Sequence, residues 1–190
     1  MRKIEVIDYD INWTNQFKAE KKLLNSALAP MVCNIHHIGS TAIPGMPAKP
    51  TIDMILEVSS LSELDLNVQK LLDLGYTAKG EFGIMGRRYF EKGLPDHTHH
   101  LHAFINNSFE TLRHTQFRDY VINHPDVAKE YGEIKRGLAS RCNNDMELYA
   151  NGKKSFIEHH QNLAISDFKG HRKNRWPFPT SFLIHWFRLS

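Results

Sequence analysis

The sequence is poor in cysteine. Its 190 residues include only Cys33 and Cys142, and no Cys-x-x-Cys spacing occurs. Because a zinc ribbon and a thioredoxin-like redox site both depend on that spacing, both classes of site are excluded. Two isolated cysteines are typical of proteins that work in a reducing compartment, so we expect a cytoplasmic location.

Long hydrophobic runs are missing as well. No apolar stretch approaches the ~20 residues that a membrane-spanning helix needs. Residues 1–6 also lack the apolar centre of a secretory signal peptide. We therefore expect no association with a membrane.

Charge of one sign is not in large excess. The formal net charge is +3 and the pI is near 8.8. Strong nucleic-acid binders concentrate lysine and arginine on one face, and the sequence shows no such concentration and no aromatic ladder. Nucleic acid stays open as a partner, but nothing in the charge pattern favours it.

An ordinary globular composition accompanies these absences. The chain is 41% hydrophobic and 24% charged, and its length suits one domain rather than two. The unusual count is 12 histidines, of which four lie between His97 and His102. That clustering calls for an explanation.

Hydrophobic periodicity predicts strands and helices first and helices alone after Asn107. Helices are expected from Asp10 or Asn12 to about Ala29, from Ser60 to Gly75, and in three segments after Asn107. Strands are expected at 32–38, 51–58, near 76, 87–91 and 99–105, and residues 3–8 are expected to form a short strand or an extended arm. Residues 39–50 hold two glycines and three prolines, which predicts a stiff loop with a short helical turn after Ser40. The pattern favours an α+β domain with a helical C-terminal part.

We place the domain at residues 1–169 and a separate tail at 170–190. The tail is basic at first and then rich in aromatic residues. It could pack on the domain, mediate homo-oligomer formation, or form a poorly ordered end.

Strand 51–58 carries the first candidate for chemistry. Its even-numbered residues are all apolar and predict a face toward the core, so Asp53, Ile55 and Glu57 lie on the other face. An ionised carboxylate on a strand is costly unless a partner balances it. Asp53 either forms an ion pair with a basic residue such as Lys49 or takes part in a functional site.

Strand 99–105 repeats this pattern. His100 and His102 share one face, ~7 Å apart along the strand. If both strands belong to one sheet, Asp53, His100 and His102 share the face opposite the helices, which is then open. An Asp and two imidazoles there predict a site for a divalent metal or for phosphate. The plainer interpretation is a solvated face that is rich in histidine.

The Gly39-Ser40-Thr41 turn is the second candidate. A glycine followed by hydroxyl residues between a strand and a helical turn is suited to bind phosphate. Lys49 precedes the next strand and could neutralise phosphate charge, and so could Arg87 and Arg88. The stretch is not a Walker loop, because no Gly-x-x-x-x-Gly-Lys-Ser/Thr pattern occurs.

Residues 37–53, His-Ile-Gly-Ser-Thr-Ala-Ile-Pro-Gly-Met-Pro-Ala-Lys-Pro-Thr-Ile-Asp, closely resemble the signature of the GrpB family. Residues 86–93, 100–102 and 117–135 resemble its later blocks, and the resemblance covers about residues 5–165. It implies a nucleotidyltransferase-like fold, a mixed sheet with helices packed on one face. In that superfamily a Gly-Ser turn precedes an acidic pair that binds Mg²⁺ or Mn²⁺ carrying a nucleoside triphosphate. Gly39, Ser40 and Asp53 match that motif.

The sequence departs from the motif at the second acid, which would fall at Ile55. Glu57 is ~13 Å from Asp53 along the strand, so His100, His102 or Glu81 would have to substitute. Three functions stay open. They are metal-dependent nucleotidyl transfer to an unknown acceptor, binding of a nucleotide or phosphorylated ligand without turnover, and His-assisted phosphate hydrolysis. Family members also occur fused to dephospho-coenzyme A kinase, which points to a nucleotide or coenzyme A context.

Overall fold

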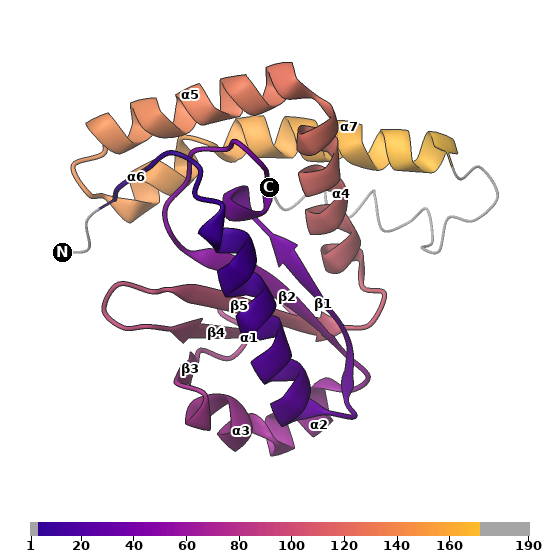
Figure 1. Cartoon of the computed structure of the whole chain (residues 1–190). Coiled ribbons are helices and arrows are strands. Elements are labelled where there is room, and N and C mark those ends of the chain that lie inside the picture. Colours follow the sequence, from indigo (N-terminus) through magenta and orange to yellow (C-terminus); the bar gives the residue numbers. More distant parts are fainter. Residues whose placement is uncertain (1–3, 172–190) are drawn as a thin grey trace.

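The computed structural model describes residues 4–171. In chain order its elements are α1 (Asn12–Leu28), β1 (Val32–Ile38), the 3-10 helix η1 (Ser40–Ala42), β2 (Ile52–Val58), α2 (Leu61–Leu66), α3 (Val68–Asp73), β3 (Tyr76–Ala78), β4 (Arg88–Lys92), β5 (His99–Ile105), α4 (Phe109–Asn123), α5 (Pro125–Arg141), α6 (Met146–Asn151) and α7 (Lys154–His171). The expected α+β class is confirmed, with strands early and helices after Asn107 (Figure 1). Most of the expected tail, residues 172–190, lies outside the described residues.

The five strands form one mixed sheet in the order β1-β2-β5-β4-β3. β1 pairs with β2 antiparallel, and β4 pairs antiparallel with both β5 and β3. The central pair, β2 and β5, is parallel. A parallel pair needs a long crossover, and here the chain between the two strands supplies α2, α3, β3 and β4.

One face of the sheet packs against α1, α2 and α3. The apolar residues of β2, such as Ile52 and Met54, meet Trp13 and Leu24 of α1 in the main core. Leu101 of β5 joins the same core. Strand alternation therefore directs the side chains of both central strands as their sequences predict.

The helical half forms a second core. Phe117, Val121, Tyr131 and Phe156 pack with residues of the 39–50 loop, including Met46. Figure 1 shows α4, α5 and α7 gathered above the sheet in this view. The loop is thus held between the sheet and the C-terminal helices. The second face of the sheet, expected to be open, is consequently covered in part. None of the helices described is both long and apolar enough to cross a membrane.

For residues 3–8 the sequence predicts a short strand or an extended arm; residues 4–8 form no regular strand and make one bridge, between Ile7 and Ala48, which fits the arm. Two other local expectations are wrong. The single helix expected after Ser60 is two short helices that meet at Asn67, whose side chain donates to the Glu63 carbonyl at 2.9 Å. Leu72, expected in the core, is 39% exposed.

A buried carboxylate ties α1 to the far edge of the sheet. Glu20 is 5% exposed and accepts a hydrogen bond from the Tyr76 hydroxyl at 2.9 Å. The Lys92 ammonium donates to both Glu20 carboxylate oxygens, at 2.8 and 2.9 Å. Because Tyr76 lies on β3 and Lys92 on β4, one side chain connects three elements.

Removal of Lys92 should therefore destabilise the chain more than an ordinary surface substitution. We expect Lys92→Met to lower the free energy of unfolding by about 1–3 kcal/mol, since it leaves a buried carboxylate without its cation. Lys22→Met, on an exposed part of α1, is the control. The double variant Glu20→Leu/Lys92→Met should recover most of the loss. Urea unfolding measures all four proteins, and a double variant no more stable than Lys92→Met would contradict the interpretation.

Candidate functional site

Parallel pairing of β2 with β5 sets Asp53 directly opposite His100 and Ile55 opposite His102. The His100 Nδ1–H donates to Asp53 Oδ1 at 2.9 Å. All four side chains leave the sheet on the face away from the main core, as the alternation predicts. A carboxylate and an imidazole therefore form the fixed centre of this face.

Asp53 is ionised in this setting. Burial by itself would raise the pKa of Asp53, but the hydrogen bond from His100 and electrostatic interaction with His100, His102 and Lys49 lower that pKa below its usual value. Asp53 thus acts as a hydrogen-bond acceptor, and His100 must carry its ring proton on Nδ1.

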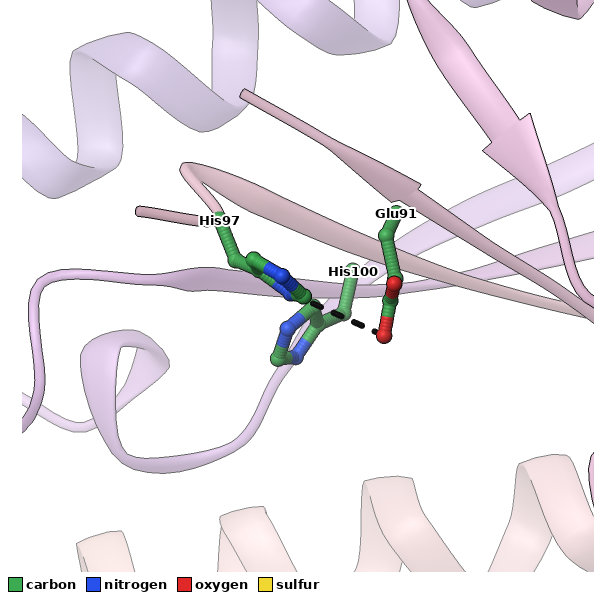
Figure 2. A group of neighbouring side chains, drawn as sticks. All are labelled: Glu91, His97 and His100. Carbon is green, nitrogen blue, oxygen red and sulfur yellow. Dashed lines mark ion pairs between the residues drawn. The ribbon is translucent and has the colours of Figure 1, made fainter. Parts of the chain in front are cut away.

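Two more potential ligand side chains lie beside His100. Glu91 of β4 pairs with His100 across the sheet, and His97 reaches in from the 93–98 loop (Figure 2). One ligand atom from each of these three residues lies within 4.8 Å of the other two. His97 Nδ1 and Glu91 Oε1 are 3.6 Å apart. Neither Glu91 nor His97 was among the site residues predicted from the sequence.

The Gly39-Ser40 turn packs directly against Asp53. Gly39 has a φ of +69°, and a Cβ built on it would lie 2.5 Å from Asp53 Oδ2. Only glycine satisfies both conditions. Ser40 begins η1, and its hydroxyl is hydrogen-bonded to Tyr131 of α5. The turn, β2 and the helical half therefore meet at one point.

A pocket of about 240 Å³ opens at that point. Its lining residues are Ser40, Thr41, Ala48, Lys49, Thr51, Asp53, His100, Lys135, Met146, Tyr149, Ala150 and Lys153. Asp53 is the single carboxylate in this lining, whereas three lysines from three separate segments contribute to it. The excess of positive charge suits an anion.

Two of the lysines are poorly solvated. Lys135 is 1% exposed and donates to the Pro47 carbonyl, and burial, reinforced by the charges of Lys153 and Arg136, lowers the Lys135 pKa to about 6. Burial and Lys49 lower the pKa of Lys153 to about 8, although Asp53 opposes the shift. Burial disfavours the charged form of both lysines, so an incoming anion would stabilise their ammonium forms.

His102 and Arg87 form a separate contact. The Arg87 guanidinium donates to His102 Nδ1 at 3.2 Å and to the carbonyls of Glu81 and Phe82. Arg87 is 6% exposed and does not line the pocket. Burial lowers the pKa of His102 to about 4, so its ring is neutral. Arg87 holds the 81–87 segment in place rather than facing the pocket.

The Arg88 side chain lies on the other face of the sheet from Asp53, the face that packs against α1, α2 and α3. Its guanidinium forms two hydrogen bonds with Asp65 of α2, at 2.7 and 2.8 Å.

Thr41 lines the pocket, but its hydroxyl donates to the Thr51 carbonyl at 3.3 Å and accepts from His37 Nε2 at 3.0 Å. Of the predicted site residues, Gly39, Ser40, Thr41, Lys49, Asp53 and His100 therefore meet at the pocket. His102 is near enough to Asp53 to affect its pKa but does not line the pocket, and neither do Arg87 and Arg88.

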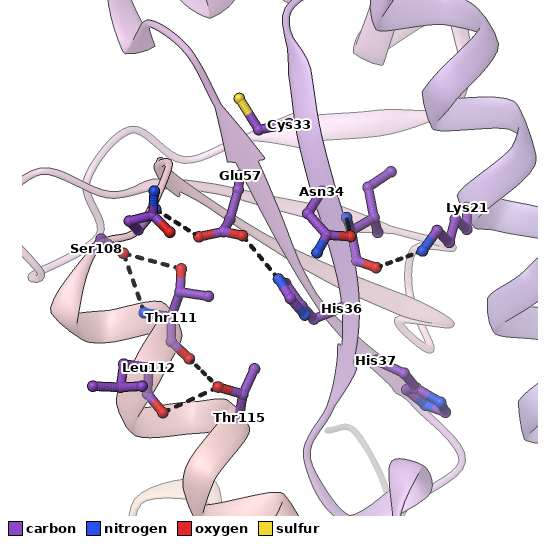
Figure 3. A network of polar contacts seen from close by, with 12 residues as sticks. Lys21, Cys33, Asn34, His36, His37, Glu57, Ser108, Thr111, Leu112 and Thr115 are labelled. Carbon is purple, nitrogen blue, oxygen red and sulfur yellow. Dashed lines mark hydrogen bonds and ion pairs between the residues drawn. The ribbon is translucent and has the colours of Figure 1, made fainter. Parts of the chain in front are cut away.

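The structure supplies no second carboxylate next to Asp53 on β2. Ile55 is fully buried in an apolar cluster with Phe104. Glu57 instead accepts a hydrogen bond from His36 Nε2 at 2.9 Å (Figure 3) and one from the Asn107 backbone N–H at 2.9 Å. Glu81 accepts from the Gly86 N–H at 2.8 Å, so it belongs to its own loop.

Sequence reasoning missed Lys135, Lys153 and Tyr149 as pocket residues. Each comes from the helical half, about 80–100 residues after Asp53, where no local pattern announces a shared site. One signal was available, because Tyr131 and Lys135 lie four residues apart on one helix face. His97 was visible only as part of the histidine cluster.

Comparison with known proteins agrees with the resemblance read from residues 37–53. Residues 3–162 match the sequence model of the family described as GrpB protein. The UPF0157 protein YqkA of Bacillus subtilis (strain 168) is 43% identical over 157 residues, which cover 83% of this chain and 46% of that protein. The chain thus spans less than half the length of this relative.

Solved structures agree as well. The crystal structure of the conserved protein GrpB from Enterococcus faecalis has a TM-score of 0.83 and 35% sequence identity, and the match covers 86% of this chain and 99% of that chain. The Cid1 poly(U) polymerase overlaps in part, with a TM-score of 0.43, 12% identity, and coverage of 68% of this chain and 45% of that chain. An overlap of that extent carries no inference about substrate or reaction.

The contact between Gly39 and Asp53 can be tested with a matched pair of variants. Gly39→Ala and Gly45→Ala both place alanine at positive φ, at +69° and +75°, but only the first brings a Cβ against another residue. We expect Gly45→Ala to cost about 1–2 kcal/mol from backbone strain. Gly39→Ala should cost more, because Asp53 must also move. Urea unfolding compares them, and equal losses would show that the turn does not press on Asp53.

Proposed function

The chain belongs to the GrpB family, and on that premise we propose that it binds the phosphate groups of a nucleotide, together with one Mg²⁺ or Mn²⁺, in the pocket beside Asp53. One observation carries the proposal. Lys49, Lys135 and Lys153 reach this pocket from a loop, from α5 and from the α6–α7 junction, and the lining contains one carboxylate. Convergent lysines in a pocket that is open to solvent on one side are suited to polyphosphate.

The pocket size and hydroxyl groups fit such a ligand. A space of about 240 Å³ accommodates a phosphate tail, with the rest of the ligand extending toward solvent. The Ser40 hydroxyl and the lysine ammonium groups are donors, which phosphate oxygens accept. Asp53 would repel a bare phosphate, so its presence favours a ligand that arrives with a cation.

One cation fits the residues present, and two do not. Mg²⁺ commonly binds one or two carboxylates together with the phosphates of its substrate. Asp53 Oδ2 lies against the Gly39 turn while Oδ1 accepts from His100, so a single carboxylate oxygen faces the turn. When bound, the cation would offset phosphate charge. Because Ile55 replaces the second acid, β2 does not offer the paired carboxylates that a two-metal centre needs.

Nucleotidyl transfer is the second candidate function. It is favoured by the close packing of Gly39 on Asp53, the arrangement implied by the resemblance to nucleotidyltransferases. Phosphate hydrolysis by a histidine pair is less well supported. His102 accepts from Arg87 and stands outside the pocket, so His100 would act alone.

Calorimetric titration of ATP, with and without Mn²⁺, tests the proposal. We expect Lys153→Ala to weaken binding by about 10–100-fold, as is typical for loss of a charge-assisted hydrogen bond. Lys154→Ala removes a neighbouring lysine that is paired with Glu158 on α7 and should bind as the wild type does. Asp53→Asn should abolish the effect of Mn²⁺.

A wild-type chain that binds neither ATP nor its Mn²⁺ complex would overturn the proposal. Equal losses in Lys153→Ala and Lys154→Ala would place the ligand elsewhere. Release of pyrophosphate from ATP, measured with the wild type and Asp53→Asn, decides between binding alone and nucleotidyl transfer.

Binding should also take up a proton through Lys135. The pKa of Lys135 is about 6, so the amine is mostly neutral at pH 7.5. An anion beside it favours the ammonium and raises the pKa, so affinity should be greatest below pH 6 and should decline as pH rises above it.

Titrations in two buffers with different ionisation enthalpies measure this proton uptake. Lys135→Met should reduce it, and the exposed Lys129→Met should not. The titration of ATP itself is common to all three proteins, so the difference isolates the lysine. Proton uptake that is unchanged in Lys135→Met would contradict the assignment.

A further inference from the structure

Three ligand side chains converge on the side of His100 that faces away from Asp53. Glu91 comes from β4, His97 from the 93–98 loop and His100 from β5, and Figure 2 shows their side chains directed toward one another. Their nearest ligand atoms lie within 4.8 Å of each other. A tetrahedral zinc site, with bonds of about 2.0–2.1 Å, places its donor atoms about 3.4 Å apart. Small side-chain movements would therefore suffice to close the set around one ion.

His100 supplies the strongest indication that a cation belongs here. Its Nδ1–H is donated to Asp53, so in the neutral ring Nε2 carries the lone pair. That Nε2 atom is buried and has no hydrogen-bond partner among the described residues. Buried polar atoms are nearly always satisfied, and a lone pair near the Glu91 carboxylate gains nothing without a cation or a proton between them.

Existing partners of Glu91 do not account for the cluster. Lys79 lies 3.5 Å from Glu91 Oε2, and the Lys79 side chain is 36% exposed. The other oxygen, Oε1, is 3.6 Å from His97 Nδ1, which is longer than a hydrogen bond. Tyr89 also forms a side-chain hydrogen bond with Glu91. These partners stabilise the Glu91 carboxylate, but none of them satisfies His100 Nε2, so they do not explain why two imidazoles gather beside Glu91.

The backbone directs His97 into the cluster. His97 has a φ of +50°, and its N–H donates to the Gly93 carbonyl at 2.6 Å. The Thr51 hydroxyl donates to the His97 carbonyl at 2.9 Å, which fastens the loop to the start of β2. A positive φ is uncommon for a residue other than glycine, and here it turns the imidazole toward Glu91.

We propose that Glu91, His97 and His100 bind one divalent transition-metal ion of the zinc class, and that Asp53 acts as a positioning residue for His100. Two imidazoles and one carboxylate suit Zn²⁺ or Fe²⁺ rather than Mg²⁺. A histidine that ligates a metal commonly donates its other N–H to a carboxylate, as His100 does to Asp53. Three protein ligands leave a coordination position for water or substrate.

This site goes beyond the nucleotide pocket and does not depend on it. The cation proposed for the nucleotide lies on the Gly39 side of Asp53, whereas the zinc-class ion lies on the far side of His100. Each can be occupied without the other. The two centres nevertheless share the Asp53–His100 hydrogen bond, through which charge at one would act on the other.

Titration of chelator-treated full-length chain with Co²⁺ and Zn²⁺ tests the site. We expect one ion per chain, with visible Co²⁺ absorption bands that Zn²⁺ displaces. Asp53→Asn should weaken binding by about 10–100-fold, the loss typical when a partner of a metal-bound histidine is removed. His97→Gly, which tolerates the positive φ, and Glu91→Gln should weaken it by more.

His159→Gln removes an exposed histidine of α7 and is the matched control, expected to bind as the wild type does. Wild type that binds neither ion, or His97→Gly and Glu91→Gln that both bind as tightly as His159→Gln, would overturn the proposal. Lys153→Ala should leave Co²⁺ binding unchanged. Failure of the metal site is therefore distinguishable from failure of the nucleotide pocket, which is read from ATP binding by the same variant.

Discussion

The register of the parallel pair β2–β5 is the constraint on which the rest of the site depends. In this register Asp53 faces His100 across the sheet. A slip of one residue would set Asp53 against Leu101 or His99, and it would turn apolar residues of one strand away from the core. The main core therefore selects the same alignment that creates the Asp53–His100 hydrogen bond. One register of β2 and β5 therefore produces both the stable core and the polar centre.

The helical half completes what the sheet begins. The sheet contributes a carboxylate and an imidazole, and α5 and the α6–α7 junction contribute Lys135 and Lys153. The stiff 39–50 loop lies between these parts and contacts both, through Gly39 on the sheet side and Met46 on the helical side. The prolines and glycines of this loop are thus explained by its place between the sheet and the helices, where it must contact both, and not by one type of turn.

Short-range patterns explain how much could be predicted. The period of two along a strand is a local property, so the face shared by Asp53, His100 and Ile55 followed directly from the sequence. The same rule, applied to β4 and the residue before it, separates Arg88 from Arg87, and grouping both as phosphate ligands overlooked it. Whether Arg87 reached the pocket could not be read, because its guanidinium is taken up by carbonyls of a loop whose shape depends on tertiary contacts.

The contribution of the helical half could not be predicted for a different reason. Lys153 and Lys135 belong to helices whose docking depends on packing between distant segments. A lysine that packs inward at 1% exposure has the same local sequence pattern as a solvated one. Family resemblance marked Tyr131 and Lys135 without giving them a role, and only the assembled structure brings them to Ser40.

The pocket beside Asp53 is lined by residues from two parts of the chain, and this affects how easily the two parts separate. A ligand bound among Lys49, Lys135 and Lys153 would contact both the sheet side and the helical side of the pocket, so it would link these two parts across their interface. The free energy needed to separate the two parts then rises with the logarithm of ligand concentration once the pocket is filled. The C-terminal helices would therefore dock more stably on the sheet when the ligand is abundant than when it is scarce, with no movement other than separation at this interface.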